Sequence, residues 1–130
     1  MGQQQILLIV LSVILVGISV AVGITMFKGY SLSSNQDAIV YDMINIGSLA
    51  YQHRIRPSML GGGNGSFENF QLPTGIDSNA NADYSVVISE DKKEITITAL
   101  SKLYTGAKIT VKYDLNLEIV ENFVKEGWDQ

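Results

Sequence analysis

The feature that most constrains this chain is an uncharged run of 22 residues, from Ile6 to Phe27. Only three hydroxyl side chains, those of Ser12, Ser19 and Thr25, interrupt it. At about 1.5 Å of rise per residue, a helix over this run is roughly 33 Å long, which is enough to cross a bilayer core of about 30 Å. We therefore expect a helix that lies in lipid or packs against copies of itself.

Two other interpretations fit this run less well. A cleaved secretory signal has a basic start and an apolar core of about 7–15 residues, whereas here no Lys or Arg precedes Lys28. A buried helix in a soluble protein needs a core around it. The rest of this 130-residue chain is too short to enclose a helix that is apolar on every side.

Beyond the run, the apolar spacing stays helical as far as Pro57. One stripe consists of Ile39, Met43, Ile46 and Ala50, and its neighbour consists of Val40, Ile44, Gly47 and Tyr51. The segment 34–37 has the form of a capping box, so a helix break there and one continuous helix are both open. We expect residues 1–56 to be helical, with residues 6–27 as the membrane or filament-core segment and an amphipathic second half.

From Tyr84 onward the apolar period changes to two, which is typical of strands with one buried face. The alternating residues are Tyr84, Val86, Ile88, then Ile95, Ile97, Ala99, then Ile109, Val111, Tyr113, with a continuation through Leu115, Leu117 and Ile119 left open. The pattern predicts an antiparallel meander of three or four strands. The chain is then an α+β protein: a helix laid across a small sheet at residues 84–130, with Gly/Asn-rich connecting loops at residues 57–83. We expect Phe123 and Trp128 to anchor the C-terminus.

Composition excludes several functional classes. The chain has no cysteine, so it has neither disulfides nor thiol chemistry. Its 13 acidic and 9 basic residues give a net charge of −4, which argues against a nucleic-acid partner. His53 is the only histidine, and no carboxylate pair, catalytic triad or cofactor loop stands out. We therefore expect neither an enzyme nor a bound cofactor.

One spacing resembles the start of a calcium-binding loop. Asp77, Asn79, Asn81 and Asp83 place oxygen side chains at alternate positions. The glycine and the bidentate glutamate of such a loop are replaced by Ala82 and Ile88. The sequence therefore leaves two interpretations: a calcium site, or a polar loop whose side chains cap turns.

The order of elements resembles the type IV pilins and pseudopilins, whose long apolar N-terminal helix packs its second half on an antiparallel sheet. The likeness is carried by residues 6–27 and, more locally, by segments 56–63 and 77–80. Three features depart from the family: Gln5 stands where pilins have glutamate, Val22 stands where they have proline, and the two-cysteine C-terminal loop is absent.

The resemblance implies a structural subunit of an extracellular filament at the cell surface. Such a subunit crosses the inner membrane once before assembly, can be methylated at a processed N-terminus, and is polymerised by pilus assembly machinery. Two alternatives stay open: a pseudopilin of a secretion system, and a monomeric membrane-anchored binding module.

Small residues four apart, such as Gly17 and Ala21, let helices approach closely. The expected filament interface comprises Gln5, Ile6, Leu7, Leu8, Leu11, Leu15, Gly17, Ala21, Gly23 and Phe27.

Overall fold

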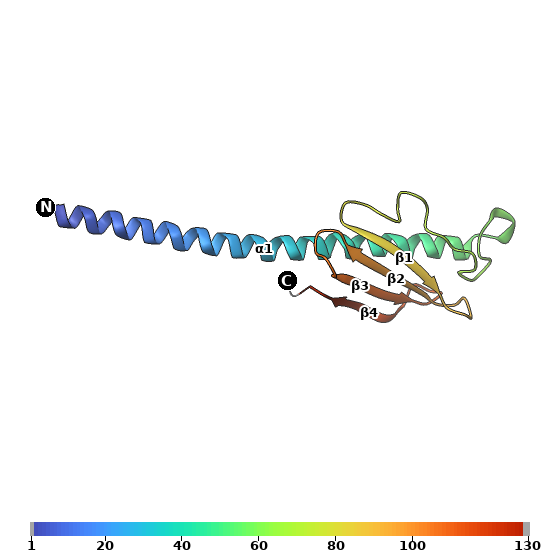
Figure 1. Ribbon diagram of the computed structural model, residues 1–130. Coiled ribbons are helices and arrows are strands. Elements are labelled where there is room, and N and C mark those ends of the chain that lie inside the picture. The colour runs from blue at the N-terminus through green and yellow to red at the C-terminus, as the bar shows by residue number, and fades with distance from the viewer. Residues whose placement is uncertain (1, 129–130) are drawn as a thin grey trace. The chain divides into compact units, whose positions relative to one another are not determined.

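The computed structural model describes residues 2–128 and has the expected α+β architecture (Figure 1). Its elements are helix α1 (Gly2–Ile55), the 3-10 turn η1 (Ser58–Leu60), and strands β1 (Ala82–Ile88), β2 (Ile95–Ser101), β3 (Lys108–Tyr113) and β4 (Ile119–Glu126). The sheet begins two residues before the predicted position, at Ala82.

The chain divides into two compact units, Met1–Ser34 and Asn35–Gln130, and each is described by itself. The first unit contains only the N-terminal part of α1. The second unit, called the head below, contains the rest of α1, the connecting loops and the sheet.

The head sheet is an antiparallel meander in the order β1-β2-β3-β4. Tyr84 pairs with Ala99, which in turn pairs with Ile109, and all three side chains are buried. Because side chains alternate between the two faces of a strand, this row marks the face turned to the core. The period-two pattern from Tyr84 to Tyr113 therefore predicted the core face correctly.

The second half of α1 covers that face. Ile39, Met43 and Ile46 are each 0% exposed, which confirms the first predicted stripe. The neighbouring stripe is covered less completely, since Ile44 remains 46% exposed. Gly47 belongs to that second stripe and is buried against Tyr113, where an added Cβ would lie 3.2 Å from the tyrosine ring.

Of the two interpretations of segment 34–37, the structure has the continuous helix, since all four residues lie inside α1. Asn35 is not a helix cap there. It is 4% exposed, and its Oδ1 accepts a hydrogen bond of 2.9 Å from the hydroxyl of Ser101. This bond ties the helix to the end of β2.

The third strand does not continue through Leu115, Leu117 and Ile119, a possibility that the sequence left open. Strand β3 ends at Tyr113, and the Oδ1 atom of Asp114 accepts hydrogen bonds from the backbone N–H groups of Asn116 (2.8 Å) and Glu118 (2.9 Å). Leu117 has a positive φ of 59°, which a continuous strand does not allow. The chain therefore turns at this point, and Ile119 starts the separate edge strand β4.

A glycine-rich loop folds back on the C-terminal end of α1. The N–H groups of Gly63 and Gly65 donate to the carbonyl oxygens of His53 (2.8 Å) and Arg54 (2.7 Å). A Cβ on Gly63 would stand 1.9 Å from the Ser66 carbonyl oxygen, so only glycine fits there. Phe67, directly after this loop, is 0% exposed and belongs to the core, although its segment was predicted as loop only.

Candidate functional site

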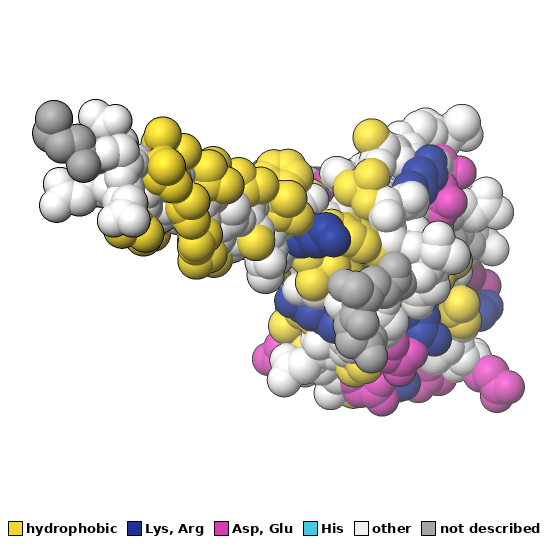
Figure 2. All heavy atoms as spheres, turned by 60° about the vertical axis from the view of Figure 1, so that its left-hand side comes forward, with side chains coloured by type: hydrophobic (Ala, Val, Ile, Leu, Met, Phe, Trp, Pro, Cys, Tyr) yellow, Lys and Arg dark blue, Asp and Glu magenta, His cyan; other side chains and the backbone are white. Residues whose placement is uncertain are grey.

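The predicted filament interface is an exposed apolar helix surface. From Ile6 to Phe27, the large hydrophobic side chains are between 50% (Val10) and 71% (Phe27) exposed. Gln5, Gly17, Ala21 and Gly23 are exposed as well. Figure 2 shows hydrophobic side chains along this part of α1, whereas Lys, Arg, Asp and Glu side chains intermingle on the head.

The hydroxyl groups in this surface are already satisfied. Ser12 donates to the Leu8 carbonyl oxygen at 2.8 Å, Ser19 to that of Leu15 at 2.8 Å, and Thr25 to that of Ala21 at 3.0 Å. Because each side-chain donor bonds within the helix, the surface presents no unpaired hydroxyl donor to an apolar environment. The surface is suited to lipid or to other apolar helices.

The two glycines of this segment have no packing role among residues 2–128. A Cβ added at Gly17 or at Gly23 would meet nothing within 4 Å. Gly47, in the head half of the same helix, is different because the Tyr113 ring lies against it. Gly17 and Gly23 are therefore free to accommodate a neighbouring helix.

This helix is long and apolar enough to span a membrane. Its most apolar 18-residue window has a mean hydropathy of 3.0 and is 0% buried, and it is the one candidate span among residues 2–128. A single-pass membrane anchor near the N-terminus is compatible with these properties.

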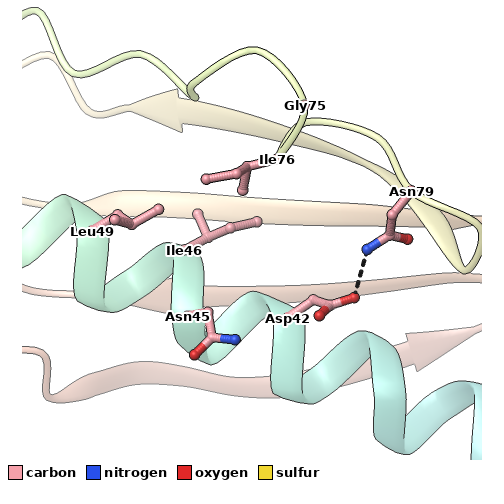
Figure 3. A pocket seen from close by; sticks show the side chains of 7 residues that line it. All are labelled: Asp42, Asn45, Ile46, Leu49, Gly75, Ile76 and Asn79. Carbon is pink, nitrogen blue, oxygen red and sulfur yellow. Dashed lines mark hydrogen bonds between the residues drawn. The ribbon is translucent and has the colours of Figure 1, made fainter.

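The head contains a cavity of about 240 Å³ between α1 and the loop that precedes β1 (Figure 3). Its lining residues are Asp42, Asn45, Ile46, Leu49, Gly75, Ile76 and Asn79. The side chains of Ile46, Leu49 and Ile76 lie together on one side, and Asp42 and Asn79 lie at the other. The cavity thus has an apolar part and a polar end, and we refer to it as the Asp42 pocket.

The carboxylate of Asp42 is held by two neutral donors. Its Oδ2 atom accepts hydrogen bonds from the Tyr84 hydroxyl at 2.5 Å and from Asn79 Nδ2 at 2.8 Å. Burial, together with the hydrogen bond to Asp42 and its negative charge, raises the pKa of Tyr84 well above the ordinary value of 10. Tyr84 therefore stays protonated and keeps donating to Asp42 at neutral pH.

No sequence signal identified this network. Asp42 lies 42 positions from Tyr84 and 37 from Asn79 in the sequence. Asp42 is set beside the buried stripe at Ile39, Met43 and Ile46, so its position on α1 turns it toward the sheet. The hydrophobic spacing of α1 shows only that Asp42 is a polar residue next to the core, and does not predict its partners.

The four residues of the predicted calcium loop lie in and just before β1. Asn79 Oδ1 caps a turn by accepting hydrogen bonds from the N–H groups of Asn81 (2.8 Å) and Ala82 (3.1 Å). Asp83 accepts a hydrogen bond from Ser78 and pairs with Lys102 at 3.3 Å. Both contacts lower the pKa of the Asp83 carboxyl.

Asp77 accepts from the N–H of Gly75 at 3.2 Å, a local contact within the loop. Among residues 2–128, no three His, Cys, Asp or Glu side chains form a metal-binding cluster. The turn-capping interpretation thus describes the contacts of Asn79, and calcium binding by Asp77, Asn79, Asn81 and Asp83 stays a prediction.

The histidine and the last aromatic residue have packing roles. His53 Nε2 is 2.7 Å from the Glu68 carbonyl oxygen, and the ring lies edge-on to Phe70 at 5.4 Å between centroids. Trp128 is 8% exposed and donates from Nε1 to the Lys108 carbonyl oxygen at 3.0 Å, which confirms it as the C-terminal anchor. Phe123 is half-buried on β4.

No family model, curated protein or solved structure matches this chain.

Proposed function

We propose that this chain is a structural subunit of a type IV pilus-like extracellular filament, polymerising through its N-terminal helix. One observation carries the proposal: every large hydrophobic side chain from Ile6 to Phe27 is at least 50% exposed. A surface of that size left in water would cost on the order of tens of kcal/mol at about 25 cal/mol per Å². Lipid can cover it before assembly, and other copies of the same helix can cover it afterwards.

Assembly of such a filament needs a head that folds without help from the helix surface used for packing. The head has its own core, in which Ile39, Ile97 and Val111 are fully buried. Packing between subunits and folding of the head depend on different residues of α1, because the uncharged apolar run ends at Phe27 and the first buried residue of the helix is Asn35. Polymerisation can then leave the head fold unchanged.

The departure at Gln5 affects how subunits would be aligned. The resemblance places an N-terminal charge pair at this position, and Gln5 lacks the charge. An amide can still donate and accept hydrogen bonds across an interface. We propose that Gln5 contributes hydrogen bonds, while alignment depends mainly on helix packing and on contacts farther along the subunit.

A second candidate function is a monomeric membrane-anchored binding module. The Asp42 pocket favours it, because the pocket combines an apolar wall with a carboxylate. A pseudopilin of a secretion system shares the proposed assembly mode and differs in forming no long filaments in the cell.

The deciding experiment is to shear cells that express the chain, pellet the extracellular fraction, and examine it by negative-stain microscopy and mass spectrometry. Thin filaments composed of this chain support the proposal. The mass of the N-terminal peptide also shows whether that end is processed and methylated. Protein that stays in the membrane fraction as monomers in detergent contradicts it and favours the binding module.

A further inference from the structure

We propose that the Asp42 pocket receives the Lys28 side chain of a second copy of this chain. The inference rests on the proposed function, since it names a contact between subunits of the filament. It concerns two residues that the hydrophobic helix surface does not include, and it gives the assembly a polar contact that can set the register between copies.

The pocket has the shape and chemistry for an alkylammonium group. A lysine side chain is an apolar four-carbon stem that ends in a compact positive charge. In Figure 3 the side chains of Ile46, Leu49 and Ile76 form one side of the cavity, and Asp42 lies at its other, polar end. The stem would lie against the former and the ammonium group would reach the latter.

Asp42 has unused capacity for a cation. A carboxylate offers about four acceptor positions, and the hydrogen bonds from Tyr84 and Asn79 both end on Oδ2 of Asp42. Both donors are neutral groups, the Tyr84 hydroxyl and the Asn79 amide. None of the four ion pairs among the described residues includes Asp42. Its negative charge therefore has no cationic partner among the described residues.

Most lysines of the chain already have a partner. Lys92, Lys102, Lys108 and Lys112 form ion pairs with carboxylates, and Lys125 donates to Gln36. Asp91 has its pKa lowered first by the hydrogen bond from Ser89 and also by the charge of Lys93, so Lys93 interacts with that carboxylate. Lys28 is exposed and forms no ion pair or side-chain hydrogen bond with any other residue from 2 to 128.

The position of Lys28 in the sequence makes a partner necessary in a filament. It is the only charged side chain between residues 2 and 36, and it directly follows the apolar run. When copies cover that run, the ammonium group next to it enters the assembly and loses water. An unpaired charge in such a place is strongly unfavourable, so a carboxylate of another copy that reached Lys28 would stabilise the assembly.

Asp37 is the competing acceptor on the same helix. It is exposed, and none of the four ion pairs among residues 2–128 includes it. Asp42 is favoured because its carboxylate is fixed by two hydrogen bonds and stands beside an apolar wall that fits the lysine stem. The two acceptors can be distinguished by experiment.

The test is zero-length cross-linking of wild-type filaments with a carbodiimide. This reagent activates a carboxylate, and an amine in direct contact then displaces it to form an amide. We expect a covalent dimer on a denaturing gel, with a peptide that joins Lys28 to Asp42 by mass spectrometry. Lys28→Arg is the matched control, because it keeps the positive charge but does not form the amide. The Lys28→Arg variant should form filaments, and the amount of cross-linked dimer from these filaments should be at least tenfold lower than from the wild type.

Asp37→Asn should leave the yield of cross-linked dimer unchanged, whereas Asp42→Asn should abolish the dimer. The fluorescence of Trp128 verifies that the head of each variant is folded. Filaments that cross-link Lys28 to Asp37 or to another carboxylate, or that yield no Lys28 cross-link, overturn this inference alone. Failure of the wild type to form filaments overturns the proposed function, and this inference with it.

Discussion

The hydroxyl of Tyr84 donates a hydrogen bond of 2.5 Å to Asp42 Oδ2, and so joins β1 to α1 across 42 positions of sequence. Asn79 Nδ2 reaches the same oxygen at 2.8 Å. Because Tyr84 is only 6% exposed, water cannot readily replace Asp42 as the hydrogen-bond partner of its hydroxyl. The bond is therefore expected to contribute to head stability independently of any role of the pocket.

Tyr84→Phe tests this contribution. The substitution removes the hydroxyl but keeps the ring, and it leaves Asp42 with one donor. We expect the free energy of unfolding to decrease by about 2 kcal/mol, in the range for hydrogen bonds to charged groups. The measurement is thermal or urea unfolding of the full chain in detergent, followed by Trp128 fluorescence. Tyr30→Phe is the control, since Tyr30 is 75% exposed, and it should change stability by less than about 0.5 kcal/mol.

The same bond predicts a dependence on alkaline pH. The pKa of Tyr84 is raised above 10 in the folded head, first by burial and then by Asp42, so the unfolded chain loses this proton at lower pH than the folded chain. Stability due to Tyr84 is fully present below about pH 10 and decreases as pH rises beyond it. Burial also raises the pKa of Tyr113, which adds to the decrease. Tyr84→Phe should flatten the profile between about pH 9 and 12, and an unchanged slope would contradict this assignment.

The sequence predicted the regular parts of the fold because their periods are local. The spacing of Ile39, Met43 and Ile46 identified the buried side of α1, and alternation from Tyr84 identified the core face of the sheet. Leu115 and Leu117 continue the same alternation, but Asp114 caps a turn there, and the cap overrides the pattern. Hydrophobic period alone does not contain this information.

The pocket and the isolated core aromatics depend on long-range contacts. Phe67 is fully buried, yet it lies directly after a glycine-rich segment that has no hydrophobic periodicity. Asp42 meets Asn79 only after α1 has packed on the sheet. Such residues become identifiable once the meander and its covering helix are placed in space, because each one needs a partner that is distant in sequence.

Trp128→Ala should destabilise the head more than any substitution on its surface. Trp128 is 8% exposed, its Nε1 donates to the Lys108 carbonyl oxygen, and its ring lies 5.9 Å from that of Tyr104. We expect a loss of about 3 kcal/mol in unfolding free energy, measured by circular dichroism because the chain has only one tryptophan. Leu103→Ala, at a site that is 61% exposed, should remain within about 0.5 kcal/mol of wild type. Equal effects of the two substitutions would contradict the anchoring role.

Gly17 and Gly47 should respond in opposite ways to added volume. A Cβ at Gly47 would press on the Tyr113 ring at 3.2 Å, so Gly47→Ala should lower head stability by about 1 kcal/mol. Gly17 has nothing within 4 Å, so Gly17→Leu should leave the unfolding transition unchanged. If helices approach each other at Gly17, the same variant should form far fewer filaments, by at least tenfold in sheared protein. Normal filament yield from Gly17→Leu would place the helix contact elsewhere.

A charge in the apolar run should abolish filaments, whereas the same charge on the head should not. Val16 and Val87 make a matched pair, because their side chains are 62% and 64% exposed in the isolated subunit. Lysine at Val16 places an ammonium group among packed helices or in lipid, at a cost of about 3 kcal/mol or more. Lysine at Val87 stays on the water-facing side of β1. We expect Val87→Lys to yield wild-type amounts of filament and Val16→Lys to yield none. Membrane fractionation of Val16→Lys separates failed insertion from failed assembly, and normal filaments from that variant would contradict burial of the run.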